Sequence, residues 1–188
     1  NNEQQTHNPT EVAYLAQNEL FPQVINDINI PSFCDDDKSR FKVGEGKLYH
    51  TMLWMGPRGT VSPLHFDPLD NLLMQVVGLK RVILFPPDEE EEEESDDEIE
   101  KILKRSRRAT TNNDRPTWHY AGIDGNQYNT SAVDIENPNH DKFPNFKALA
   151  PTPYETLLGP GDVLYIPKKW WHHVRSCELS VSANVWWR

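Results

Sequence analysis

The hydrophobic residues of this chain lie in short runs separated by turn residues, and few stretches are long enough for a helix. Two β-branched, apolar runs at 71–77 and 80–85 predict strands, and Gly78-Leu79 between them predicts a hairpin or a sharp bend. A third strand is predicted at 47–55, with Leu48, His50, Met52 and Trp54 on one face and Tyr49, Thr51, Leu53 and Met55 on the other. This pattern indicates a β-rich domain.

More strands are predicted toward the C-terminus, at 156–158, 163–167 and 178–187, with a Gly-Pro-Gly-Asp turn at 159–162. The last strand has an apolar face of Leu179, Val181, Ala183, Val185 and Trp187, and a second face of Ser180, Ser182, Asn184 and Trp186. The second face fits either the inner wall of a polar pocket or an edge strand with one face in water.

The N-terminal segment allows two interpretations. Residues 11–20 read as a short helix by propensity, or as a strand with Val12, Tyr14 and Ala16 on one face. Residues 21–30 predict a helix-like turn and a loop that ends before Pro31. Residues 118–147 are aromatic, Asn-rich and irregular, which predicts an ordered cover over the strands.

Residues 88–116 have a low-complexity composition, an acidic tract followed by a basic patch, and predict a mobile surface insertion. Residues 88–108 hold eleven acidic and five basic residues, so they contribute −6 to the formal charge of −10 and leave −4 for the rest. Binding of nucleic acid over the whole surface is therefore disfavoured. The surroundings of Ser95 suit an acidophilic kinase, and 104–108 suits a weak nuclear-import signal.

The length of 188 residues suits a single domain. The chain contains no apolar run that would span a membrane and no secretory signal, and its start at Asn1 suggests a C-terminal fragment of a longer protein. Cys34 and Cys177 are expected to be free thiols, since an isolated pair fits a reducing compartment better than a disulfide framework.

A candidate metal site lies in the segment 62–68, Ser-Pro-Leu-His-Phe-Asp-Pro. In an extended strand, side chains two residues apart point to the same face, so His65 and Asp67 are able to bind one metal ion together. A second histidine would complete the two-histidine, one-carboxylate site of a non-haem Fe(II) oxygenase. The segment from Gly161 through Pro167 to Trp170-Trp171-His172 supplies such a histidine.

Lys80 places a cation on a strand face that is otherwise apolar, beside Val82 and Leu84. The usual exposure of lysine favours an ammonium in water at the end of a strand. The alternative is an anionic ligand in a pocket.

His65-x-Asp67, Lys80 and the segment from Gly161-Asp162 to His172 together resemble the JmjC-domain 2-oxoglutarate oxygenases. The chain is most similar to the subfamily of jumonji-domain-containing protein five, whose members are described as arginyl hydroxylases and as lysine demethylases. That closer resemblance rests on residues 14–17, 62–65, 131–138, 142–144 and 182–187. It covers nearly the whole chain except 88–116, which is not part of the family pattern.

The resemblance implies a mainly β fold, a double-stranded β-helix or cupin-like jelly roll with a few flanking helices. It implies that His65, Asp67 and His172 bind Fe(II), with the adjacent His173 on the other side of its strand. Lys80 would bind the distal carboxylate of 2-oxoglutarate. Further cosubstrate residues would be Tyr14, which is then expected on a strand, with Ser62, Asn71 and Asn184, and the substrate would meet Trp54 and Trp186.

The function implied by the resemblance is hydroxylation of an arginine side chain in a basic protein or peptide, with O2 and 2-oxoglutarate consumed at Fe(II). One alternative is an Nε-methyl-lysine demethylase. Another is a non-catalytic reader or scaffold on the same fold, against which the complete set of three metal ligands counts. The expected location is the nucleus, the cytoplasm or both.

Overall fold

The computed structural model describes residues 13–36, 43–87, 117–121 and 128–188. The expectations for the insertion at 88–116, including Ser95 and the basic patch at 104–108, lie outside the described residues.

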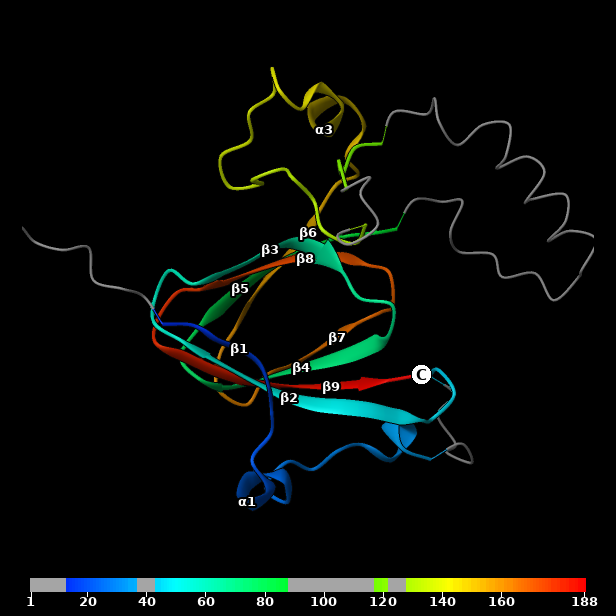
Figure 1. Ribbon diagram of the computed structural model, residues 1–188, viewed down its shortest axis with the longest axis vertical. Helices are drawn as coiled ribbons and strands as arrows, with labels where there is room; N and C mark the ends of the chain where they lie inside the picture. Colours follow the sequence, from blue (N-terminus) through cyan, green and yellow to red (C-terminus); the bar gives the residue numbers. More distant parts are fainter. Residues whose placement is uncertain (1–12, 37–42, 88–116, 122–127) are drawn as a thin grey trace, which may run out of the picture.

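Two antiparallel sheets face each other (Figure 1). Sheet A has the strand order β1 (Leu15–Glu19), β2 (Leu48–Gly56), β9 (Ser180–Trp187), β4 (Asp70–Val77) and β7 (Val163–Ile166). Sheet B has the order β3 (Val61–Phe66), β8 (Trp171–Ser176), β5 (Lys80–Phe85) and β6 (Tyr154–Leu158). The described helical segments are short: α1 (Pro22–Ile25), the 3-10 turn η1 (Ser32–Cys34) and α3 (Pro144–Leu149). The predicted mainly β jelly roll is confirmed.

Within residues 11–20, Leu15–Glu19 form a strand, which confirms the strand interpretation for this part, whereas Val12 lies outside the described residues. β1 begins at Leu15, so Tyr14 directly precedes the strand instead of lying within it as expected. The strand is irregular: Gln17 has a positive φ of 55°, and the pairing with β2 shifts register between Leu15 and Asn18. β1 is therefore a short, irregular strand at the edge of sheet A.

The hairpin alternative for the two runs around Gly78 is wrong, and the sharp bend is what the structure contains. β4 belongs to sheet A and β5 to sheet B, so the chain passes from one sheet to the other within two residues. Gly78 has a φ of 69°, and a Cβ on it would lie 2.0 Å from the carbonyl oxygen of Leu179. The Gln75 amide donates to the carbonyls of Val77 and Gly78, and so holds the bend from inside.

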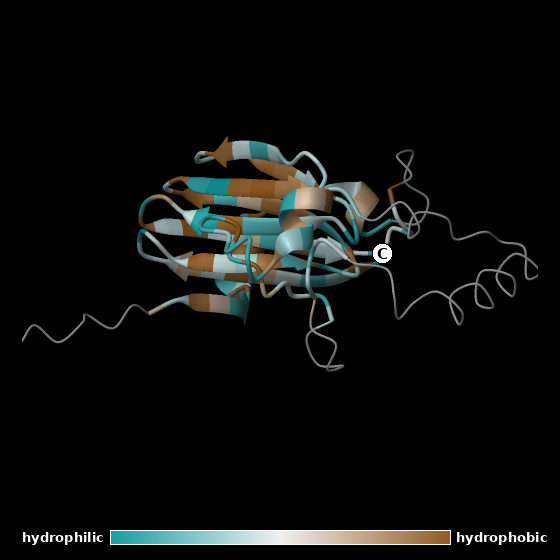
Figure 2. Cartoon of the chain, turned by 90° about the horizontal axis from the view of Figure 1, so that it is seen from above, coloured by the Kyte–Doolittle hydropathy of each residue, from teal (hydrophilic) through white to brown (hydrophobic). Residues whose placement is uncertain are grey.

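The last strand, β9, lies in the middle of sheet A between β2 and β4, so the edge-strand alternative is wrong. Its polar face is buried, and Ser180 and Ser182 have no exposed surface. Polar side chains therefore face the space between the sheets, where each must find a partner. Figure 2 shows this mixture of hydrophilic and hydrophobic residues along single strands.

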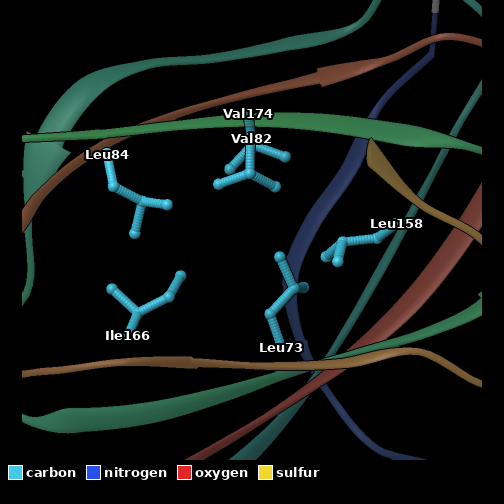
Figure 3. Packing of buried hydrophobic residues seen from close by; sticks show 6 residues of the cluster. All are labelled: Leu73, Val82, Leu84, Leu158, Ile166 and Val174. Carbon is cyan, nitrogen blue, oxygen red and sulfur yellow. The ribbon is translucent and has the colours of Figure 1, made fainter. Parts of the chain in front are cut away.

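An apolar cluster fills one part of the space between the sheets. Leu73 and Ile166 project from sheet A toward four residues of sheet B in Figure 3, namely Val82, Leu84, Leu158 and Val174. The sandwich is thus apolar at this point and polar beside it, where the serines and asparagines of β9 and β4 lie.

Two further clusters cover the outer faces. Trp118, with Phe146 of α3, packs on Phe85 and Trp171, which confirms an ordered cover over sheet B for the described part of 118–147. Cys34 of η1 packs under sheet A against Leu72, Val185 and Trp187. Both Cys34 and Cys177 are free thiols, as predicted. Among the described residues, no helix is long and apolar enough to cross a membrane.

Candidate metal and cosubstrate site

The three predicted metal ligands meet at one end of the space between the sheets. β3 and β8 pair with His65 directly opposite His172, and Asp67 follows the last residue of β3. The ligand atoms of the three side chains all lie within 4.8 Å of one another. The His172 Nε2 to Asp67 Oδ2 distance is 3.7 Å. Strand register therefore brings together residues that are 107 positions apart (172 − 65).

Both histidines are oriented by their own backbone. His65 Nδ1 lies 2.7 Å from the carbonyl oxygen of Pro63, and His172 Nδ1 lies 2.9 Å from that of Trp170. Because a carbonyl only accepts, each Nδ1 carries the proton and donates it, which leaves each Nε2 with a lone pair. Such hydrogen bonds are the usual support of a metal-binding imidazole. The donor set fits Fe(II), which takes two imidazoles and one carboxylate on one face.

The protonation state of His172 also suits a metal ligand. His172 is buried, and burial together with the neighbouring His65 lowers its pKa, so its imidazole stays neutral, as a metal ligand must be. The carboxylate of Asp67 accepts a hydrogen bond from the indole Nε1 of Trp186 at 3.0 Å. Trp186 belongs to sheet A, so it orients a ligand at the end of a strand of sheet B.

A cavity of about 400 Å³ opens beside the triad, part of it exposed to solvent. All ten residues predicted for the site line this cavity. They are Tyr14, Trp54, Ser62, His65, Asp67, Asn71, Lys80, His172, Asn184 and Trp186.

Lys80 is buried, so the exposure favoured by the usual behaviour of lysine is wrong. Only 2% of its surface is exposed, and its ammonium donates a hydrogen bond of 2.5 Å to Ser182 Oγ. Burial lowers the pKa of Lys80 to about 8. No carboxylate of the described residues forms an ion pair with it. A buried ammonium with a single hydroxyl as its partner suits an anionic group brought by a ligand.

The other predicted cosubstrate residues are held in pairs. Tyr14 OH and Ser62 Oγ lie 3.2 Å apart, and burial raises the pKa of the Tyr14 phenol, which stays protonated. Asn184 Nδ2 donates to Asn71 Oδ1 at 2.7 Å, and both amides are buried. Each pair has hydrogen-bonding capacity left over, because a hydroxyl and a carboxamide each have more donor and acceptor sites than one hydrogen bond uses.

Trp54 of β2 lies opposite Ser182 of β9. Its side chain is therefore on the inner face of sheet A, as is the Ser182 hydroxyl that accepts a hydrogen bond from Lys80. Its indole Nε1 is buried and has no hydrogen-bond partner. Trp186 instead contacts the metal-ligand carboxylate. The two tryptophans predicted for the substrate side thus contact different parts of the site.

Several residues of the site were not among the predicted ones. Ser182, the hydroxyl partner of Lys80, lies on the same face of β9 as Asn184, the face for which the sequence allowed the inner wall of a polar pocket. Leu73, Ile166 and Val174 form an apolar wall, and Gln17 lines the cavity through the irregular part of β1. No local pattern predicts a break in the middle of a strand.

His173 lies on the other side of β8, as predicted. It lines a separate hollow together with Glu136 and Arg175, and its Nε2 is 4.0 Å from Glu136 Oε2. It is therefore not part of the metal site.

The family model of the cupin-like domain matches residues 1–188 of this chain. Lysine-specific demethylase 8 of Xenopus tropicalis is 36% identical over 181 residues, which is 94% of this chain and 33% of that protein. Jumonji C domain-containing protein 5 of Drosophila melanogaster is 35% identical over 183 residues, which is 94% of this chain and 37% of that protein.

Among solved structures, YcfD, a ribosomal oxygenase from Escherichia coli in complex with cobalt and 2-oxoglutarate, superposes with a TM-score of 0.41 and 16% identity. The match covers 75% of this chain and 24% of that chain. The chain spans 33% and 37% of the length of the two curated relatives. On the family match over its whole length and on its relatives, the chain belongs to the cupin-like family and is a JmjC-type domain.

Proposed function

We propose that this chain is an Fe(II)- and 2-oxoglutarate-dependent protein oxygenase, with an arginine side chain as the group that it hydroxylates. Removal of methyl groups from Nε-methyl-lysine by the same chemistry is the second candidate. The JmjC family supports the oxygenase class, and the resemblance to the arginyl hydroxylase subfamily supports arginine. The name of the Xenopus relative, lysine-specific demethylase 8, favours the second candidate.

The observation that carries the proposal is the buried ammonium of Lys80 in the same cavity as the triad. Fe²⁺ with two neutral imidazoles and one carboxylate has a net charge of +1, and Lys80 adds another. A dianionic cosubstrate neutralises both charges in a partly dry cavity, where unpaired charge is costly. A dicarboxylate is thus the ligand that this arrangement of charge favours.

Fe(II) supplies the redox chemistry, in which O2 and 2-oxoglutarate are consumed and a C–H bond is hydroxylated, with succinate and CO2 as coproducts. The residues of the chain position the reactants. His65, Asp67 and His172 would hold the ion, since their ligand atoms lie within 4.8 Å of one another. Lys80 binds the distal carboxylate, with Tyr14, Ser62, Asn71 and Asn184 as further polar contacts.

The apolar wall of the cavity has a different role from the polar residues. Leu73, Ile166 and Val174 line the cavity and continue into the apolar cluster between the sheets. They pack against the methylene groups of the cosubstrate and exclude water, which strengthens the interaction of Lys80 with the carboxylate.

The test is an assay of the purified chain with Fe(II), 2-oxoglutarate and arginine-containing or methyl-lysine peptides. The expected products are succinate and a peptide heavier by about 16 Da, the mass of the oxygen that the metal centre inserts. The second candidate predicts release of formaldehyde and loss of a methyl group instead.

His172→Ala is expected to abolish turnover, with His173→Ala as the matched control, since His173 lies on the outer side of the same strand. Full activity in His172→Ala would contradict the proposal. Cosubstrate and metal binding without turnover of any peptide would favour a reader or scaffold on this fold.

A further inference from the structure

The two ligands His65 and Asp67 are joined through Phe66, and two peptide units set their relative orientation. The N–H of Phe66 belongs to the peptide bond with His65, and its carbonyl belongs to the bond with Asp67. Because each peptide unit is planar and contains the Cα atoms on both of its sides, fixing these two groups fixes the relative positions of the Cα atoms of both ligands.

Both of these backbone groups are bonded to one residue, Asn129. The Phe66 N–H donates to the carbonyl oxygen of Asn129 at 2.9 Å. The side-chain Nδ2 of Asn129 donates to the carbonyl oxygen of Phe66 at 3.0 Å. Any residue at position 129 supplies the first bond through its backbone, whereas the second bond requires a side-chain donor of this length.

The segment around Asn129 runs along β3 and pairs with it through an isolated bridge. Ser131 N–H donates to the carbonyl of Leu64 at 2.8 Å, and His65 forms an antiparallel bridge with Thr130. β3 is the first strand in the order of sheet B, so this segment pairs with its outer edge. Among the described residues, the pairing involves Leu64 to Phe66, the part of β3 that carries His65 and leads into Asp67.

The side chain of Phe66 is fixed at the same time. Its ring lies 5.7 Å from that of Tyr128 and 5.0 Å from that of Trp171, in edge-to-face contacts. Phe66 is thus held by its ring and by both of its backbone groups, while its two neighbours project into the cavity.

We propose that Asn129 is a positioning residue for the metal site, and that it acts through both peptide units of His65-Phe66-Asp67. This inference rests on the proposed function, because it assigns Asn129 to the same metal centre. When the backbone of two ligands is already fixed, no further backbone entropy is lost there as the ion binds. Loss of the Nδ2 donor frees the peptide unit next to Asp67, and the metal affinity falls.

The experiment measures Co(II) binding by the full chain through visible absorption, which reports the number and geometry of the ligands. Asn129→Asp keeps the size of the side chain and replaces the donor with an acceptor. We expect its Kd for Co(II) to rise about tenfold, with an altered absorption spectrum, as for other residues that support metal ligands. Asn129→Ala, which removes the donor without adding charge, is expected to change both in the same direction.

Asp134→Ala is the matched control. The Asp134 carboxylate accepts the backbone N–H groups of Glu136 and Asn137, so this variant weakens the same covering segment without touching β3. It is expected to lower the melting temperature and to leave the Kd and the spectrum unchanged. An unchanged Kd in both Asn129 variants, or an equal rise in Asp134→Ala, would overturn the inference. Failure of the proposed function is a different result, because it appears as absence of peptide turnover by the wild-type chain, whereas this inference is measured by Co(II) binding alone.

Discussion

Lys80 is the residue that we propose to bind the distal carboxylate of the cosubstrate. Burial lowers its pKa to about 8, so its ammonium loses its proton within an accessible pH range. We therefore expect the affinity for 2-oxoglutarate to fall as the pH rises above about 8, because the protonated form binds the dianion. The measurement is calorimetric titration of the Co(II)-loaded chain at a series of pH values.

Lys80→Met is the corresponding control. It removes the charge at every pH, so we expect the Kd for 2-oxoglutarate to rise by about thirtyfold, equivalent to about 2 kcal/mol for a charge-assisted hydrogen bond. Its pH dependence above 8 should be absent. A wild-type affinity that is flat across this range would show that Lys80 does not bind the cosubstrate as an ammonium.

At the scale of elements, Glu136 anchors the covering segment to sheet B. Its carboxylate accepts hydrogen bonds from the guanidinium of Arg175, lies 3.8 Å from Arg81 Nη1 and faces His173. The bond with Arg175 lowers the pKa of Glu136. We expect Glu136→Gln to lower the free energy of unfolding at pH 7 by about 2 kcal/mol, because it removes the carboxylate that accepts from Arg175.

The pH dependence of this effect has a defined sign. Since the folded-state pKa of Glu136 is lowered, its stabilisation is complete above the ordinary carboxyl pKa and disappears as the pH falls through the lowered one. Urea unfolding at decreasing pH should therefore show the wild type and Glu136→Gln converging in acid. Glu155→Gln is the control: Glu155 also binds Arg81, but it is fully exposed, and no measurable change is expected. A constant difference across the pH range would contradict this assignment.

The existence of most strands followed from local patterns, but their pairing did not. Residues 47–55 and 80–85 read as strands because apolar and β-branched residues are concentrated there, and both are strands within one residue. The bend at Gly78 was left open between two forms because the choice depends on contacts with Leu179, 101 positions away (179 − 78). Local sequence contains no information on such a contact.

The candidate site was likewise only partly predictable from local sequence. The spacing of His65 and Asp67 predicts a shared face from geometry alone. The choice of His172 over the adjacent His173 rested on family resemblance, since the approach of His172 depends on the register of β3 with β8. The local pattern at Lys80 favoured exposure, because burial of a lone lysine requires a polar partner, and that partner, Ser182, comes from the other sheet.

At the scale of the whole molecule, the bend at Gly78 carries the chain from β4 in sheet A to β5 in sheet B. We expect Gly78→Ala to cost at least about 3 kcal/mol of unfolding free energy, since its Cβ would overlap the Leu179 backbone, 2.0 Å away. Gly161→Ala is the matched control: its φ is 92°, yet nothing lies within 4 Å of the added Cβ. Its expected cost is about 1–2 kcal/mol, from backbone strain alone.

Chemical denaturation of the two glycine variants separates steric overlap from strain. Equal losses would show that the positive φ, and not the close approach to Leu179, explains the glycine at position 78.

The central place of β9 in sheet A has a consequence for biosynthesis. β2 and β4 do not pair with each other; each pairs with β9, whose residues are translated after theirs. While a ribosome is still making the segment before Ser180, the emerging chain therefore lacks the strand that joins these two halves of the sheet. Sheet A closes, and Trp186 reaches Asp67, only when Ser180–Trp187 has left the exit tunnel.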